Sequence, residues 1–142
     1  MNTKLSHFLK YAYLFYFGGS LYVTIETFWR ARSHWTMFVL VGLIFMWLDS
    51  MNERWGWDFG LVWQVLIGTI GGTIAEFVCG CIVNLWLKWD IWDYSNLPFN
   101  LLGQISLYFT LAWIPLVLIG IILGDLIRWR FFDEEKPRYK LL

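Results

Sequence analysis

Two glutamates, Glu26 and Glu76, lie within stretches that otherwise read as lipid-spanning helices. A carboxylate at membrane depth is costly unless it faces protein, water or a partner charge, so such a residue is a candidate functional site. Arg30 follows Glu26 at i+4, with the acid first, which is the favourable order for an ion pair on a helix. These side chains could bind a cation, a proton or a cationic group, with the arginine holding an anionic one.

The neighbours of Glu76 indicate which way its side chain points. On a helix with about 100° between successive residues, its face carries small and hydroxylated residues such as Gly72 and Thr73. The bulky Ile74 and Val78 lie on the opposite side. Small residues let a second helix approach closely, so we expect Glu76 to face a helix interface or a cavity rather than lipid.

Further polar residues cluster toward one side of the predicted membrane domain, in the outer half of the helices and in the outer loops. They define a candidate pocket for a polar, ionic or lipid-headgroup ligand. Its predicted members are Glu26, Arg30, Arg32, His34, Glu76, Asn84, Asp93, Asn100 and Gln104. The cytoplasmic half of the predicted helices is expected to carry fewer such polar residues.

Simpler interpretations of the same residues stay open. Glu76 could be a protonated carboxyl group that hydrogen-bonds a neighbouring helix, and Glu26 with Arg30 could be only an interfacial ion pair. The amides could be contacts between helices. Asp125 with Arg128 is most simply an ion pair at the cytoplasmic end of the last helix.

The elements that position these residues follow from composition. The 142 residues are 58% hydrophobic and 15% charged, whereas a soluble domain is about one quarter charged. We expect an all-α, polytopic membrane protein, with 1–142 as one domain and 128–142 as a frayed cytoplasmic tail. Its predicted transmembrane helices are 8–29, 35–51, 61–87 and 101–127. Turn-forming Asn96 and Pro98 predict a structured outer loop between the third and fourth helices.

Positive charge predicts the orientation in the plasma membrane. One side carries Lys4, Lys10, Arg54, Arg128, Arg130, Lys136, Arg138 and Lys140. The other side carries Arg30, Arg32 and Lys88. The positive-inside rule then places both termini in the cytoplasm. The net charge of zero gives no indication of nucleic-acid binding.

The chain contains no nucleotide-binding loop, no Cys-x-x-Cys pair and no His-Glu-x-x-His sequence, which are the motifs of common nucleotide and metal sites. We therefore predict neither a metal nor a cofactor. No catalytic residues are assigned, and the balance is against an enzyme.

Several long motifs resemble a small bacterial membrane family catalogued as putative ABC-transporter type IV, CmpB-like. The similar segments are 18–30, 32–38, 71–77, 84–86 and 92–104. The resemblance covers roughly residues 15–115 and implies a multi-pass protein with a role in transport. Because the chain has no ATPase motif, the resemblance would require a partner ATPase subunit.

Three functions remain open at this point. The first is transport or transport-associated binding, in which a homodimer or a partner membrane subunit completes the pathway. The second is an intramembrane enzyme acting on a lipid or lipid-linked substrate, with a glutamate as general base and Arg30 holding a phosphate. The third is a structural or regulatory subunit that packs through its glycine faces. Membrane lipids are expected partners in all three.

Overall fold

Helices form most of the computed structural model, which describes residues 3–31 and 33–142. The long helices are α1 (Thr3–Arg30), α2 (Trp35–Trp55), α3 (Leu61–Gly80) and α4 (Leu107–Phe132). The all-α fold class is thereby confirmed. A short antiparallel hairpin of β1 (Asn100–Leu101) and β2 (Ile105–Ser106) is the only sheet within the described residues.

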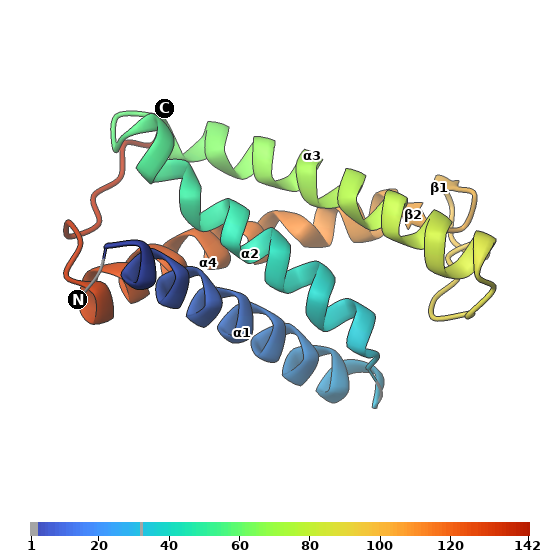
Figure 1. Cartoon of the computed structure of the whole chain (residues 1–142). Helices are drawn as coiled ribbons and strands as arrows, with labels where there is room; N and C mark the ends of the chain where they lie inside the picture. The colour runs from blue at the N-terminus through green and yellow to red at the C-terminus, as the bar shows by residue number, and fades with distance from the viewer. Residues whose placement is uncertain (1–2, 32) are drawn as a thin grey trace.

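The helices pack around α2, as Figure 1 shows. Helix α2 lies against α1 over most of its length and also contacts α3 and α4, whereas α1 touches α4 only lightly. Both chain termini lie at one end of the molecule, and the β1–β2 hairpin lies at the other (Figure 1). We call these the termini end and the loop end.

Two glycines allow large aromatic rings into the helix contacts. A β-carbon at Gly18 on α1 would overlap the Phe45 side chain of α2, and one at Gly71 on α3 would overlap the indole of Trp47. Glycine at such positions lets packed helices approach closely. These glycine faces are therefore covered by side chains of this same chain.

Two of the predicted transmembrane helices are long and apolar enough to span a bilayer within the described residues. They are Leu61–Trp86 and Leu107–Phe132, while Trp35–Met51 is a shorter apolar stretch. On α3, Ile74 and Val78 are 58% and 51% exposed, whereas Glu76 is 4% exposed. This arrangement confirms the predicted orientation of Glu76, with the aliphatic face left for lipid.

The fourth predicted helix has different boundaries from those expected, whereas the third, 61–87, agrees within one residue with Leu61–Trp86. Helix α3 continues after Gly80 as a π-helix, η1 (Cys81–Trp86). The fourth helix begins at Leu107 and not at residue 101, because Asn100 pairs with Ser106 in the hairpin. The Ser106 hydroxyl then accepts a hydrogen bond from the Phe109 backbone N–H, which is the usual role of serine at a helix N-terminus.

The prediction of a frayed tail is wrong. Helix α4 extends to Phe132, and the chain then folds back to the start of α3. There the N–H of Leu61 donates to the carbonyl of Lys140 at 2.7 Å, and the N–H of Val62 donates to that of Leu141 at 3.0 Å. The first N–H groups of a helix lack acceptors within the helix. The tail supplies carbonyl acceptors for two of these groups at the start of α3.

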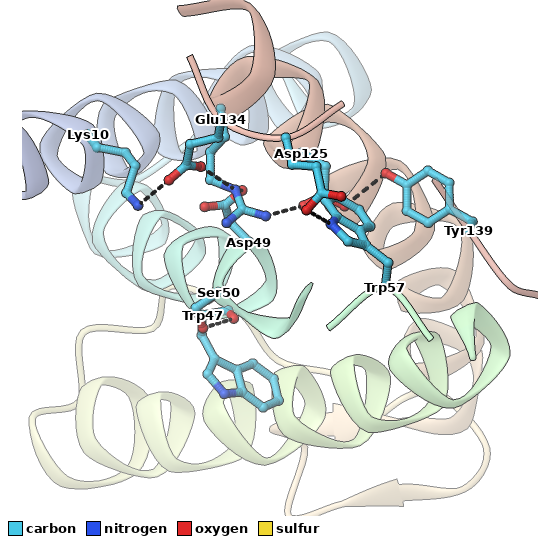
Figure 2. A network of polar contacts seen from close by, with 10 residues as sticks. Lys10, Trp47, Asp49, Ser50, Trp57, Asp125, Glu134 and Tyr139 are labelled. Carbon is cyan, nitrogen blue, oxygen red and sulfur yellow. Dashed lines mark hydrogen bonds and ion pairs between the residues drawn. The ribbon is translucent and has the colours of Figure 1, made fainter. Parts of the chain in front are cut away.

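A buried ionic network holds the termini end together. Arg128 on α4 lies 2.6 Å from Asp125 and 3.0 Å from Asp49 on α2. Lys10 on α1 lies 2.9 Å from Glu134 in the tail, and Glu134 lies 3.4 Å from Arg128. Figure 2 shows Lys10 of α1, Asp49 of α2, Asp125 of α4 and Glu134 of the tail lying close together in this network. We call these four residues and Arg128 the termini-end cluster.

The termini-end cluster contradicts the expectation that this half of the protein carries few polar residues within its helices. Asp49 and Asp125 are 0% and 1% exposed, and the Tyr139 hydroxyl donates to Asp125 at 2.8 Å. A β-carbon at Gly124 would crowd the Asp49 carboxylate, so glycine makes room for it. The simple end pair predicted from Asp125 and Arg128 is therefore part of a larger network.

Replacing Arg128 tests how far this network supports the fold. Arg128→Met leaves Asp49 and Asp125 buried without their cation, and breaking a buried pair in this way costs about 3–5 kcal/mol. We expect a clearly lower melting temperature for the purified protein in detergent. The matched control is Arg130→Met, because Arg130 is exposed on the same helix. Equal melting temperatures for the two variants would show that the cluster is not stabilising.

Candidate functional site

A polar pocket lies at the loop end, between the end of α1, the start of α2 and the loop that follows η1. Its volume is about 150 Å³, and its lining comes from Glu26 and Arg30, from Ser33, His34 and Met37, and from residues 89–92 and Tyr94. Three separate segments of chain therefore meet at one cavity. We call it the polar pocket.

Charges of both signs line the polar pocket. Glu26 and Arg30 lie one helical turn apart on α1, and Asp90 faces them from the loop. The Glu26 carboxylate accepts a hydrogen bond from the Tyr22 hydroxyl at 2.9 Å. The Arg30 guanidinium lies close to the Tyr94 hydroxyl and 5.3 Å from the centre of the Phe109 ring. Arg30 is thus positioned by the aromatic side chains of Tyr94 and Phe109.

Glu76 stands behind the wall of the polar pocket and does not line it. One of its oxygens accepts a hydrogen bond from the Tyr94 hydroxyl at 3.0 Å, and the other accepts one from the Trp113 indole N–H at 2.9 Å. Tyr94 itself lines the pocket. The two glutamates therefore approach the same region from α1 and α3, and Tyr94 connects Glu76 to it.

Tyr94 is held in this position by contacts on its ring and its hydroxyl. Its ring stacks on Phe109 with centroids 4.5 Å apart. Burial and the nearby Glu76 carboxylate raise the pKa of Tyr94 above its usual range. A tyrosine phenol is already protonated at neutral pH, and its hydroxyl donates to Glu76.

His34 lines the polar pocket and also organises the start of α2. Its Nδ1 lies 2.8 Å from the Thr36 hydroxyl and accepts from the Thr36 backbone N–H at 3.2 Å. The imidazole packs near the rings of Trp35 and Trp89, with centroids 5.6 and 6.1 Å away. This predicted site residue is therefore at the pocket, with Nδ1 occupied by the turn.

Asn84 and Gln104 lie together at a different place, where they clamp the loop onto η1. The Asn84 amide donates to the Gln104 side-chain oxygen at 2.8 Å, and its own oxygen accepts from the N–H of Ile91 at 2.7 Å. The Trp92 indole donates to the Gln104 carbonyl at 3.0 Å. These amides are outside the lining of the polar pocket and hold the segment that supplies its wall.

The other predicted residues stabilise turns of the loop. The Asn100 amide donates to the Leu97 carbonyl at 2.8 Å and its oxygen accepts from the Gly103 N–H at 3.0 Å. Asp93 accepts from the side chain and backbone of Ser95, which holds the pKa of Asp93 below its usual range. Neither residue lines the polar pocket. Arg32 lies outside the described residues.

Several residues that form the site were not among the predicted ones. Tyr94 and Asp90 come from a loop whose path the sequence does not specify. Tyr22 carried a usable signal, because it precedes Glu26 by four residues and so lies on the same helix face. Across the described residues, no group of three or more His, Cys, Asp or Glu side chains is arranged to hold a metal ion.

One known protein family matches most of the chain. Residues 5–138 match the family described as "Putative ABC-transporter type IV". No solved structure matches the chain.

Removing the Asn84 clamp tests whether the loop depends on it. Asn84→Leu deprives Ile91 and Gln104 of buried partners, and each buried group left unpaired costs about 1–3 kcal/mol. We expect faster amide hydrogen exchange across residues 89–94 in the purified protein. Asn84→Asp is the matched variant, because it keeps the oxygen that Ile91 requires, and it should exchange more slowly than Asn84→Leu. Unchanged exchange in both variants would contradict the clamp.

Proposed function

Because the chain belongs to the family described as "Putative ABC-transporter type IV", we propose that it is a transport-associated membrane protein that binds a small zwitterionic group in the polar pocket. The observation that carries the proposal is that Glu26, Asp90 and Arg30 face one cavity. A cation can lie against the carboxylates while an anion lies against the guanidinium.

Two features of the polar pocket support a bound ligand. The Ser33 hydroxyl is buried at the pocket and has no hydrogen-bond partner among the described residues, and a buried polar group is normally paired. The volume of about 150 Å³ matches that of a cavity of about 150 Å³ known to hold benzene in another protein. A phosphate or an ammonium group is of this order of size.

The proposed topology has four membrane spans with both termini in the cytoplasm of a bacterial cell. In support of it, the positive residues are concentrated at the termini end, as the positive-inside rule requires. The polar pocket then opens toward the outer face of the plasma membrane. Helix α1 would be the most polar span, with Lys10 and Glu26 both largely buried against protein.

A complete transport pathway needs more than this chain. Four spans are few for such a pathway, so a second copy or a partner membrane subunit would complete it. The chain carries no nucleotide-binding loop, so ATP-driven transport would use a separate ATPase subunit. Packing through the Gly18 or Gly71 face is a weaker basis for such a complex, because those faces are already covered by Phe45 and Trp47.

Binding of O-phosphoethanolamine to the purified protein tests the proposal. This probe carries one ammonium and one phosphate group and no acyl chain. We expect calorimetry to show saturable binding, and Arg30→Gln and Glu26→Gln should each weaken it by about tenfold or more, since hydrogen bonds to charged groups contribute about 1.5–3 kcal/mol. Arg130→Gln, outside the pocket, should bind like the wild type. Absence of wild-type binding would reject the proposal.

Glu76→Gln tests the link through Tyr94. The substitution replaces one of the two accepting oxygens with an NH₂ group, which is a donor, so the side chain can no longer accept from both Tyr94 and Trp113 as the carboxylate does. We expect about fivefold weaker phosphoethanolamine binding, equivalent to about 1 kcal/mol, through displacement of Tyr94. Tyr94→Phe should reproduce the loss, whereas Trp113→Phe should retain most of the affinity. If both Glu76→Gln and Tyr94→Phe bound O-phosphoethanolamine with wild-type affinity, the proposed contribution of Glu76 to binding would be rejected.

A further inference from the structure

We propose that the ligand is a membrane lipid, with its zwitterionic headgroup in the polar pocket and an acyl chain in an apolar groove beside it. This inference rests on the function proposed above and names the substrate class of the same site. The groove, which we call the lateral groove, is lined by one face of each of three helical segments, within residues 18–25 of α1, 41–48 of α2 and 113–120 of α4.

The lateral groove exists because α1 and α4 barely touch. Helix α1 packs closely on α2 but makes few contacts with α4, which leaves a trough between them with α2 as its floor. Gly120 on α4 deepens it, since a β-carbon there would come within 3.3 Å of Leu48. The lining is apolar apart from the Tyr22 hydroxyl and the Trp113 indole N–H, and the latter donates to Glu76.

The groove and the pocket meet at one hydrogen bond. Tyr22 lines the lateral groove, and its hydroxyl donates at 2.9 Å to Glu26, which lines the polar pocket. On α2 the same transition occurs between Val41 in the groove and Met37 in the pocket, one helical turn apart. A polar recess and an apolar trough are therefore neighbours along two helices.

This order of surfaces matches the chemistry of a phospholipid. The carboxylates of Glu26 and Asp90 suit an ammonium group, and Arg30 suits the phosphate. The polar pocket is too small for a whole phospholipid, so the rest of the molecule must leave it. Residues 18–25 provide about 10 Å of groove at 1.5 Å per residue, which runs along the helix as an acyl chain would. Within a bilayer such a trough fills with hydrocarbon and not with water.

Photo-crosslinking in a defined bilayer tests the inference. The full chain is placed in nanodiscs of phosphatidylglycerol that contain a trace of phosphatidylethanolamine with a diazirine in one acyl chain. We expect adducts in residues 18–25 and 113–120 at least about fivefold above those on the exposed α3 face around Ile74. Phosphatidylglycerol with the same diazirine chain lacks the ammonium group and should not show this enrichment.

A matched pair of variants separates the groove from the pocket. Ile25 lines the lateral groove and Ile74 lies on the exposed face of α3; both are isoleucines in helices and are 43% and 58% exposed. Ile25→Trp should abolish the enrichment of adducts and leave binding of O-phosphoethanolamine unchanged. Ile74→Trp should change neither measurement.

The outcomes distinguish the two proposals. If O-phosphoethanolamine binds but the groove is labelled no more than the α3 face, the ligand is a free polar solute and the lipid inference is overturned. Enrichment that survives Glu26→Gln and Arg30→Gln would also overturn it, because the headgroup would not be selected. If the soluble probe does not bind at all, the proposed function itself fails.

Discussion

The buried Glu76 carboxylate is the interaction on which the loop end depends. It joins α3, α4 and the loop, because its two oxygens accept from Tyr94 and Trp113. A buried carboxylate without such donors would be costly. The Tyr94 hydroxyl is one of these donors, so its hydrogen bond to Glu76 holds the loop against the helices. Tyr94 then forms a wall of the polar pocket, and the position of the pocket follows from the position of one glutamate.

The two ends of the molecule use buried charge in different ways. In the termini-end cluster, Arg128 and Lys10 are each within ion-pair distance of carboxylates from other segments, which serves to fasten the tail and three helices. At the loop end, Glu26 and Arg30 face a cavity and are oriented by Tyr22 and by aromatic neighbours. The first arrangement favours stability, and the second leaves charge available to a ligand.

The sequence predicts helix faces better than it predicts partners. The burial of Glu76 and the exposure of Ile74 follow from helical periodicity, and the structure confirms both. The sequence places the amides of Asn84 and Gln104 in the predicted pocket, yet the two side chains hydrogen-bond to each other. An amide can pair as well with a loop as with a ligand, so residue type alone does not identify its partner. Asp49 lies within the predicted helix 35–51, but the sequence does not indicate its partner, since its contact with Arg128 joins helices that only the tertiary fold brings together.

The membrane itself limits what an apolar groove can contribute to recognition. Lipid chains are as apolar as the groove, so moving an acyl chain from bilayer to groove yields little hydrophobic free energy. Selection among lipids must therefore come from the polar pocket, where Glu26, Asp90 and Arg30 lie. The groove instead fixes the direction from which a headgroup can arrive: sideways from the bilayer, between α1 and α4, and past the Tyr22–Glu26 hydrogen bond.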